Sequence, residues 1–339
     1  MKPGKAKKPA PRQRRSQPRL FRVAHRHRTG KYLLGDSTEF LNSPDGRRLR
    51  GKVDLILTSP PFPLNNKKSY GNLQGDHYRA WFAQLAPLFS NLLAPRGSLV
   101  IELGNAWEPN RPVQSLLTIR SLLSLVDHPE AQLRLIQEFV CYNPSRLPSP
   151  AQWVTVNRIR TVDSYTHVWW LAKTDRPKAD NGRVLRPYSK AMRDLLRRQK
   201  YNAGKRPSQH AISETGFLKN HGGSIAHNFL ELEPLDKARD VRLPNAFSLA
   251  NSTSNDCFAK LCREKQIPVH PARMQPGLAS FFIDLLTEPG DLVLDPFAGS
   301  NTTGYAAAQA RRRWVAIESN PDYVRQSRLR FGLLKQSNG

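Results

Sequence analysis

Long hydrophobic runs, paired cysteines and acidic residues are all scarce in this sequence, and each scarcity excludes a class of protein. No apolar run approaches the ~20 residues that a bilayer-spanning helix needs, so an integral membrane protein is not expected. The first residues lack an apolar segment, which argues against a secretory signal. Cys141, Cys257 and Cys262 show no Cys-x-x-Cys spacing, and the nine histidines show no His-x-x-x-His pair. We therefore expect a reducing compartment and no metal site.

The shortage of acids is the most informative absence. Fifty-three Lys and Arg face 27 Asp and Glu, which leaves a net charge of +26. A soluble protein this basic is expected to bind a polyanion, most simply nucleic acid. The first 31 residues hold twelve Lys or Arg and no acid. We predict that residues 1–30 form a disordered basic tail that either keeps the protein soluble or attracts phosphates; a nuclear-import signal also fits.

The 339 residues, 39% of them apolar, can form one large or two modest domains. Alternating strand and helix patterns predict an α/β fold with a parallel sheet. Strands are predicted at 31–36, 53–58, 98–102, 139–142, 167–172, 292–295 and 314–318, and helices at 78–93, 116–126, 278–286 and 302–311. The patterns divide the chain into a first half (31–175), a polar region (176–256) and a second half (257–335). The polar region is very basic and contains one helical pattern near Met192, which favours binding of a target.

A strand, a turn with a glycine and a helix follow one another from Leu292 to Gly304. Asp295 ends the strand, Gly299 permits close approach of a ligand to the backbone, and Ser300 and Thr302 can cap the helix. Glu318 ends the next strand, 23 residues after Asp295. An acid in that place suits the hydroxyls of a ribose, so the segment predicts a Rossmann-like site for an adenosine.

This turn lacks both the Gly-x-Gly-x-x-Gly pattern of dinucleotide sites and the Gly-Lys-Ser/Thr of a Walker loop. That favours S-adenosylmethionine, which has no phosphate. Only 21 residues follow Glu318, and two strands cannot form a domain. The rest of the sheet must come from the first half of the chain, so we expect a circularly permuted Rossmann-like fold.

A second motif, Thr58-Ser59-Pro60-Pro61-Phe62, follows the buried strand 53–58 directly. In open α/β sheets, ligand chemistry lies at the carboxyl ends of the strands. Two prolines fix the backbone and remove two N–H donors, which leaves carbonyl groups and the Ser59 hydroxyl as acceptors. Such a turn can hold an exocyclic amine while Phe62 stacks on its ring. Acceptors on both amine hydrogens favour a pyramidal nitrogen, whose lone pair can attack a methyl group directly. A base in a duplex must first be flipped out.

Together these motifs resemble the β-class DNA amino-methyltransferases, most closely the cytosine-N4 branch. Residues 58–62 are similar to the catalytic motif T-S-P-P-Y/F of that class, and residues 295–304 are similar to its cofactor motif D-P-F-x-G-S-G-T-T. Catalytic motif, target recognition region and cofactor motif come in the same order here. The resemblance implies the permuted methyltransferase fold, S-adenosylmethionine as cofactor and 176–256 as the target recognition region. Asn301, in place of a glycine, and Met274-Gln275, in place of Phe-Pro, depart from the pattern.

The resemblance also implies roles for individual residues. Ser59, Pro60, Pro61 and Phe62 are the expected catalytic residues. The expected cofactor-binding residues are Asp36, Thr58, His270, Pro271, Phe281, Asp295, Pro296, Phe297, Gly299, Ser300, Asn301, Thr302, Thr303 and Glu318. Arg146, Trp153 and Arg158 fall where the family approaches the target strand, and Arg193, Arg197, Arg198 and Lys200 are the candidates for DNA contacts in the recognition region. Glu102, at the end of strand 98–102, is expected to be structural, with a place in the site as the alternative.

The target base follows from one position. Adenine-N6 enzymes of this superfamily usually carry Asp or Asn where Ser59 stands, so serine favours cytosine; adenine stays open. A cytosine carbon-5 enzyme would need a Pro-Cys nucleophile, and none of the three cysteines follows a proline. A silent, basic DNA-binding protein with the same fold is a further alternative. Double-stranded DNA is the expected partner, in the cytoplasm with the nucleoid, and a separate restriction endonuclease is possible; the oligomeric state is open.

Overall fold

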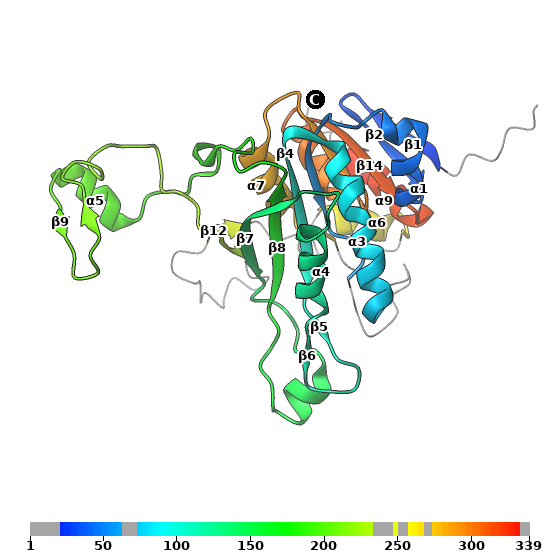
Figure 1. Cartoon of the computed structure of the whole chain (residues 1–339), viewed down its shortest axis with the longest axis horizontal. Coiled ribbons are helices and arrows are strands. Elements are labelled where there is room, and N and C mark those ends of the chain that lie inside the picture. Colours follow the sequence, from blue (N-terminus) through cyan, green and yellow to red (C-terminus); the bar gives the residue numbers. More distant parts are fainter. Residues whose placement is uncertain (1–20, 63–72, 233–246, 250–256, 268–272, 333–339) are drawn as a thin grey trace, which may run out of the picture.

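The computed structural model describes residues 21–62, 73–232, 247–249, 257–267 and 273–332. Its centre is a ten-stranded sheet with helices on both faces (Figure 1). The strands are β1 (Phe21–His27), β2 (Gly30–Gly35), β3 (Val53–Thr58), β4 (Leu93–Gly104), β5 (Ala106–Trp107), β6 (Gln114–Ser115), β7 (Arg134–Tyr142), β8 (Tyr165–Ala172), β9 (Gly204–Lys205), β10 (Ala211–Ile212), β11 (Phe229–Leu232), β12 (Phe247–Leu249), β13 (Leu292–Asp295) and β14 (Arg313–Glu318). The helices are α1 (Ser37–Asn42), α2 (Pro44–Arg47), α3 (Gly75–Leu92), α4 (Leu117–Val126), α5 (Lys190–Arg198), α6 (Cys257–Glu264), α7 (Pro276–Leu286), α8 (Thr302–Gln309) and α9 (Pro321–Gly332), with a π-helical turn η1 (Gln152–Val156) and a 3-10 turn η2 (Asn181–Val184).

The order of the strands in the large sheet is β1-β2-β14-β13-β3-β4-β8-β7-β11-β12. Strands β2, β14, β13, β3 and β4 are parallel, and β8 runs antiparallel to both of its neighbours. The late strand β13 therefore lies between β14 and the early strand β3. This confirms the permuted α/β fold: the two halves of the chain build one sheet.

The burial of β3 explains why its sequence is apolar throughout. Leu55 and Leu57 face a core that α7 and α8 cover, whereas Val53 and Ile56 face a second core under α1, α3 and α4. A strand that is covered on both faces is expected to be a continuous run of aliphatic residues. Because both faces are covered, a ligand can reach this part of the sheet only at the strand ends.

The structure corrects one predicted boundary and adds to the description of another region. The tail assigned to residues 1–30 includes β1, which pairs antiparallel with β2; residues 1–20 lie outside the described part. The region 176–256, predicted to recognise the target, also contributes strands to the large sheet, because β11 pairs with β7 and β12 lies beside β11. Neither end was recognisable, since β1 is basic and half-exposed and β11 has only four residues.

Within that region, residues 187–223 form a lobe that stands apart from the sheet at the left of Figure 1. It contains α5 and the hairpin β9–β10. Its two ends are joined by an antiparallel bridge, in which the backbone N–H groups of Arg186 and Ser224 each donate to the other's carbonyl at 2.9 Å. Tyr201 and Phe217 pack edge to face within the lobe. The lobe is thus an exposed, basic projection whose base is closed by the bridge between Arg186 and Ser224.

Candidate active site

The two motifs predicted to meet do meet. Strands β3 and β13 are neighbours, and the Thr58 hydroxyl donates to Oδ1 of Asp295 at 2.8 Å across 237 positions of sequence. The catalytic turn 58–62 and the cofactor turn 295–301 therefore lie side by side at the carboxyl ends of the parallel strands. Two ligands, one bound to each turn, would therefore lie next to each other.

The cofactor turn takes its shape from Asn301. This residue has φ +62°, in the left-handed region, and caps α8 by accepting from the Gly304 N–H at 3.1 Å. Asparagine tolerates that region better than most side chains do, which explains how it replaces a glycine. Its Nδ2 donates to Oγ of Ser327 at 3.2 Å, and Ser327 lies 2.8 Å from Nε2 of His25. Burial lowers the pKa of His25 to about 4, so the ring is neutral at pH 7. Strand β1 and helix α9 thus support the turn together.

Three further side chains hold the turn, and the sequence did not indicate them. The Tyr32 hydroxyl donates to the Gly299 carbonyl, and the Ser37 hydroxyl donates to the Pro296 carbonyl. Nε of the buried Arg330 donates to the Ser300 carbonyl at 3.1 Å. Tyr32 and Arg330 belong to ordinary amphipathic patterns and carry no local signal. Ser37 did carry a signal in the sequence, because it follows Gly35-Asp36 at the end of a predicted strand.

Two acids face this turn without a counter-charge. Asp295 is 4% exposed and accepts from Thr58 and the Phe297 N–H, the latter at 3.1 Å. Glu318 accepts from the backbone N–H groups of Gly299 at 2.9 Å and Asn320 at 2.8 Å. Burial raises the pKa of both, that of Asp295 to about 6. Within the described ranges neither carboxylate forms an ion pair, so this end of the sheet favours a cation.

The catalytic turn contacts Glu102 on β4, a residue that was expected to be structural. The Ser59 hydroxyl lies 3.4 Å from Oε2 of Glu102, and the Thr166 hydroxyl donates to Oε1 at 3.1 Å. Burial raises the pKa of Glu102, while Thr166, nearby Arg146 and Ser59 counteract the rise. The alternative prediction, that Glu102 lines the site, is therefore the one that the geometry supports.

The ring of Phe62 lies at the same edge and closes the turn against β4. A Cβ atom on Gly104 would lie 2.8 Å from two ring carbons, so only glycine leaves room for the ring there. Pro60 is buried, and Ser59, Pro61 and Phe62 remain half-buried at the strand end.

The remaining predicted cofactor residues differ in position. Asp36 caps α1 by accepting from the Glu39 N–H at 2.9 Å and is exposed at the end of β2. Phe281 packs in the core between the rings of Phe139 and Phe282. Ser300 in the cofactor turn is buried, as are Thr302 and Thr303 in the first turn of α8. Phe297 packs edge to face on Trp81, and His270 and Pro271 lie outside the described residues.

The predicted DNA contacts fall in two places. Arg146 lies near Glu102, and its Nη1 donates to the Tyr165 carbonyl at 3.1 Å. Trp153 and the exposed Arg158 belong to the loop around η1, at the bottom of Figure 1. Arg193, Arg197 and Arg198 on α5, with Lys200 after it, lie on the distant lobe. The structure does not bring these two groups together.

Comparison with known proteins identifies the family. A family model described as DNA methylase (N6_N4_Mtase) matches residues 53–329. The chain belongs to this family. It is 40% identical over 305 residues to the type II methyltransferase M.PvuII of Proteus hauseri, covering 89% of this chain and 83% of that protein. The solved structure of PvuII DNA methyltransferase (cytosine-N4-specific) matches with a TM-score of 0.66 and 34% identity, over 91% of this chain and 88% of that one. A shorter match, 43% identical over 56 residues, links 16% of this chain to 19% of the DNA adenine methyltransferase YhdJ of Escherichia coli.

These findings confirm the resemblance to the DNA amino-methyltransferases and the fold class. Two further observations concern other kinds of site. No described helix of this DNA methylase is long and apolar enough to cross a membrane. In the same residues, no group of three or more His, Cys, Asp or Glu side chains could hold a metal ion.

Proposed function

We propose that this DNA methylase transfers a methyl group from S-adenosylmethionine to the exocyclic N4 amine of cytosine in double-stranded DNA. The observation that carries the proposal is the contact between Thr58 and Asp295, which joins an amine-binding turn to a turn suited to a cationic adenosine cofactor. Similarity to M.PvuII over most of both chains supports the same activity.

The pocket residues fit this cofactor. Asp295 and Glu318 are two carboxylates without a cation among the described residues, and S-adenosylmethionine carries a positive sulfonium and ammonium group. Glu318 lies at the end of the second strand, where a carboxylate can accept from both hydroxyls of a ribose. Gly299, with φ +50°, lets the backbone approach the ligand closely. When bound, the cofactor supplies an electrophilic methyl group.

The catalytic turn then has to hold and activate the amine. The Ser59 hydroxyl donates toward Glu102, so its oxygen is free to accept one amine hydrogen. The Pro60 and Pro61 residues stiffen the turn, and a backbone carbonyl of this turn accepts the second hydrogen. Two acceptors localise the lone pair on nitrogen. The turn containing Asp295 would hold the cofactor beside it, and the new N–C bond would form as the bond between the methyl carbon and the sulfonium sulfur breaks.

The nitrogen must lose one proton as it gains the methyl group. Glu102 is placed to receive that proton through Ser59, because its carboxylate lies 3.4 Å from the serine oxygen and burial makes it more basic than an exposed glutamate. Thr166 holds the other carboxylate oxygen in place. Serine, rather than an acid or amide, at position 59 favours cytosine over adenine.

DNA binding rests on charge. The chain carries a net charge of +26, and exposed arginines occupy both the lobe around α5 and the loop around η1. We propose that the lobe contacts base edges in the major groove, with Arg193, Arg197, Arg198 and Lys200 as candidates. A separate restriction endonuclease, acting on the same sequence in a bacterial cytoplasm, would fit an activity of this type.

The product identifies the function directly. The purified protein is incubated with unmethylated DNA and methyl-deuterated S-adenosylmethionine, and the DNA is digested to nucleosides for mass spectrometry. The proposal predicts labelled N4-methylcytosine. Labelled N6-methyladenine would move the chemistry to the other base, and DNA binding without any labelled nucleoside would identify a silent binding protein.

A further inference from the structure

The loop between β7 and β8 (residues 143–164) carries an unusual group of exposed apolar side chains. Leu147 is 80% exposed, Val156 is 69% exposed and Ile159 is 60% exposed. Val156 ends the π-helical turn η1, and Ile159 follows three residues later. Aliphatic side chains gathered in one protruding segment indicate a surface that a partner covers.

The loop is an ordered structure, so its apolar tip is held in place. The Ile159 N–H donates to the Trp153 carbonyl at 3.0 Å, which closes the turn. The guanidinium of Arg160 lies 3.0 Å from the ring centre of Trp107, on β5. Asp163 accepts from Trp107 Nε1 at 3.2 Å and from Asn105 at 2.8 Å. The hairpin β5–β6 therefore braces the loop, as the bottom of Figure 1 shows.

The two ends of the loop are linked to the catalytic turn through Thr166 and Glu102. The Asn143 N–H donates to the Ser164 carbonyl at 2.7 Å, which closes the base of the loop. Thr166, two residues further on, holds Glu102, the partner of Ser59. The loop therefore projects from the same end of the sheet as the catalytic turn.

The charges around the tip select the partner. The loop contains Arg146, Arg158 and Arg160 against one acid, Asp163, whose oxygens are engaged by Asn105 and Trp107. A second copy of a chain with a net charge of +26 would be repelled electrostatically, whereas duplex DNA is attracted. DNA also offers an apolar interior, because side chains can insert between stacked bases.

We propose that Val156 and Ile159 form a wedge that enters the base stack when the target cytosine is flipped out. Extruding a base costs a few kcal/mol of pairing and stacking, and an apolar side chain in the vacated space offsets part of that cost. The braced loop keeps the wedge ordered before binding, which lowers the entropy lost on insertion. The inference rests on the proposed DNA methylation.

The test is a single-turnover methylation assay of the double variant V156S/I159S. The substrates are two duplexes containing the sequence that the wild-type protein modifies: one with the target cytosine paired to guanine, one with it opposite an abasic site. We expect the variant to methylate the paired duplex at least about tenfold more slowly than wild type, since losing ~1.4 kcal/mol gives that factor. Because the abasic duplex needs no unpairing, the variant should recover the wild-type rate there.

The matched control is Leu123→Ser on α4, which replaces an exposed aliphatic residue outside the loop and should leave both rates unchanged. Calorimetry with S-adenosylmethionine shows whether V156S/I159S has an intact cofactor site. Wild-type rates for the variant on the paired duplex, or an equal loss on both duplexes, would overturn the wedge. Failure of the wild-type protein to methylate either duplex would instead count against the proposed function.

Discussion

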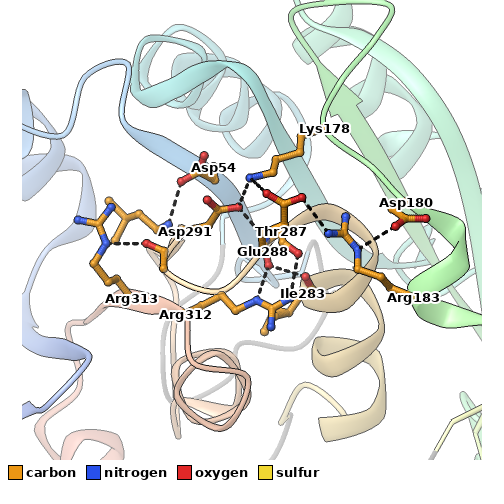
Figure 2. Close-up of polar contacts among 12 residues, drawn as sticks. Asp54, Lys178, Asp180, Arg183, Ile283, Thr287, Glu288, Asp291, Arg312 and Arg313 are labelled. Carbon is orange, nitrogen blue, oxygen red and sulfur yellow. Dashed lines mark hydrogen bonds and ion pairs between the residues drawn. The ribbon is translucent and has the colours of Figure 1, made fainter.

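The acids at the two ends of the short strand β13 lie in opposite electrostatic surroundings. Asp291 precedes the strand and Asp295 ends it, four residues later. At the Asp291 end, Lys178 Nζ lies 2.6 Å from Asp291 and 2.8 Å from Glu288, and these contacts lower the pKa of Glu288 (Figure 2). At the Asp295 end no cation among the described residues pairs with the carboxylate, and burial raises its pKa to about 6.

The difference separates what stabilises the fold from what binds a ligand. The network in Figure 2 ties the segment after β8 to the turn before β13 and to the start of β14, through Lys178, Arg183 and Arg312. Unpaired buried charge is costly and is therefore rare unless a ligand offsets it. The end with unpaired acids is therefore the proposed cofactor site, whereas the end with paired acids holds the segment around Lys178 and Arg183 against the sheet.

The largest effect on methylation is expected from a change in the catalytic turn, which lies beside the Asp295 end of β13. Ser59→Ala removes the acceptor for the amine and the path to Glu102. We expect single-turnover methylation to fall at least ~100-fold, the usual size of a general acid–base contribution, while the dissociation constant of the cofactor is unchanged. Ser124→Ala on α4 is the matched control. Near-normal turnover of the Ser59 variant would contradict the proposed role.

Substitutions near the Asp291 end should instead lower the free energy of unfolding. Arg312 is 6% exposed and donates to the Thr287 hydroxyl at 3.0 Å and its carbonyl at 2.8 Å. Arg312→Met leaves buried acceptors unpaired and should lower the free energy of unfolding by about 2–3 kcal/mol, measured by urea denaturation. The neighbouring Arg313→Met, at an exposed residue, should cost far less. Equal costs for the two variants would show that burial of Arg312 is unimportant.

Cofactor binding at the Asp295 end should also depend on pH. With its pKa raised to about 6, Asp295 is ionised above that pH and neutral below it. A neutral carboxyl no longer attracts a cation, so cofactor affinity should fall as pH drops through 6, approaching about tenfold per pH unit. Asp295→Asn should bind weakly and with little pH dependence, as followed by calorimetry between pH 5 and 8. A wild-type affinity that stays flat across this range would contradict the assignment.

The smallest effect is expected at Lys178, which is partly exposed. Lys178→Met should lower the free energy of unfolding by about 1 kcal/mol or less, because solvent screens such pairs. Since Lys178 lowers the pKa of Glu288, its contribution is present above the ordinary glutamate pKa and is lost as pH falls through the lowered value. Thermal unfolding at neutral and acidic pH measures both. A loss that persists in acid would point to packing rather than charge.

The sequence predicted those parts of the site that depend on local backbone chemistry. Strand ends followed by Asp295-Pro296 or Ser59-Pro60 are recognisable from periodicity and turn residues alone, and they determined the place of the site. Tyr32 and Arg330 could not be predicted, because each acquires its role only when distant segments pack against Gly299 and Ser300.

The same reason explains what was missed in the fold. Strand β1 has a basic, half-exposed sequence that resembles a tail, and only its pairing with β2 reveals it. Glu102 lies near the end of the buried strand β4 like any structural acid, and its contact with Ser59 depends on the neighbouring positions of β3 and β4. Tertiary pairing, rather than local propensity, decides such residues.

One calorimetric titration compares the two ends of β13 most directly. S-adenosylmethionine is titrated into Asp295→Ala and Asp291→Ala, two variants that remove the same side chain from opposite ends of one strand. The account predicts that Asp295→Ala weakens cofactor binding by about tenfold or more, the value of a hydrogen bond to a charged group, whereas Asp291→Ala binds like the wild type. Equal affinity in the two variants would contradict it.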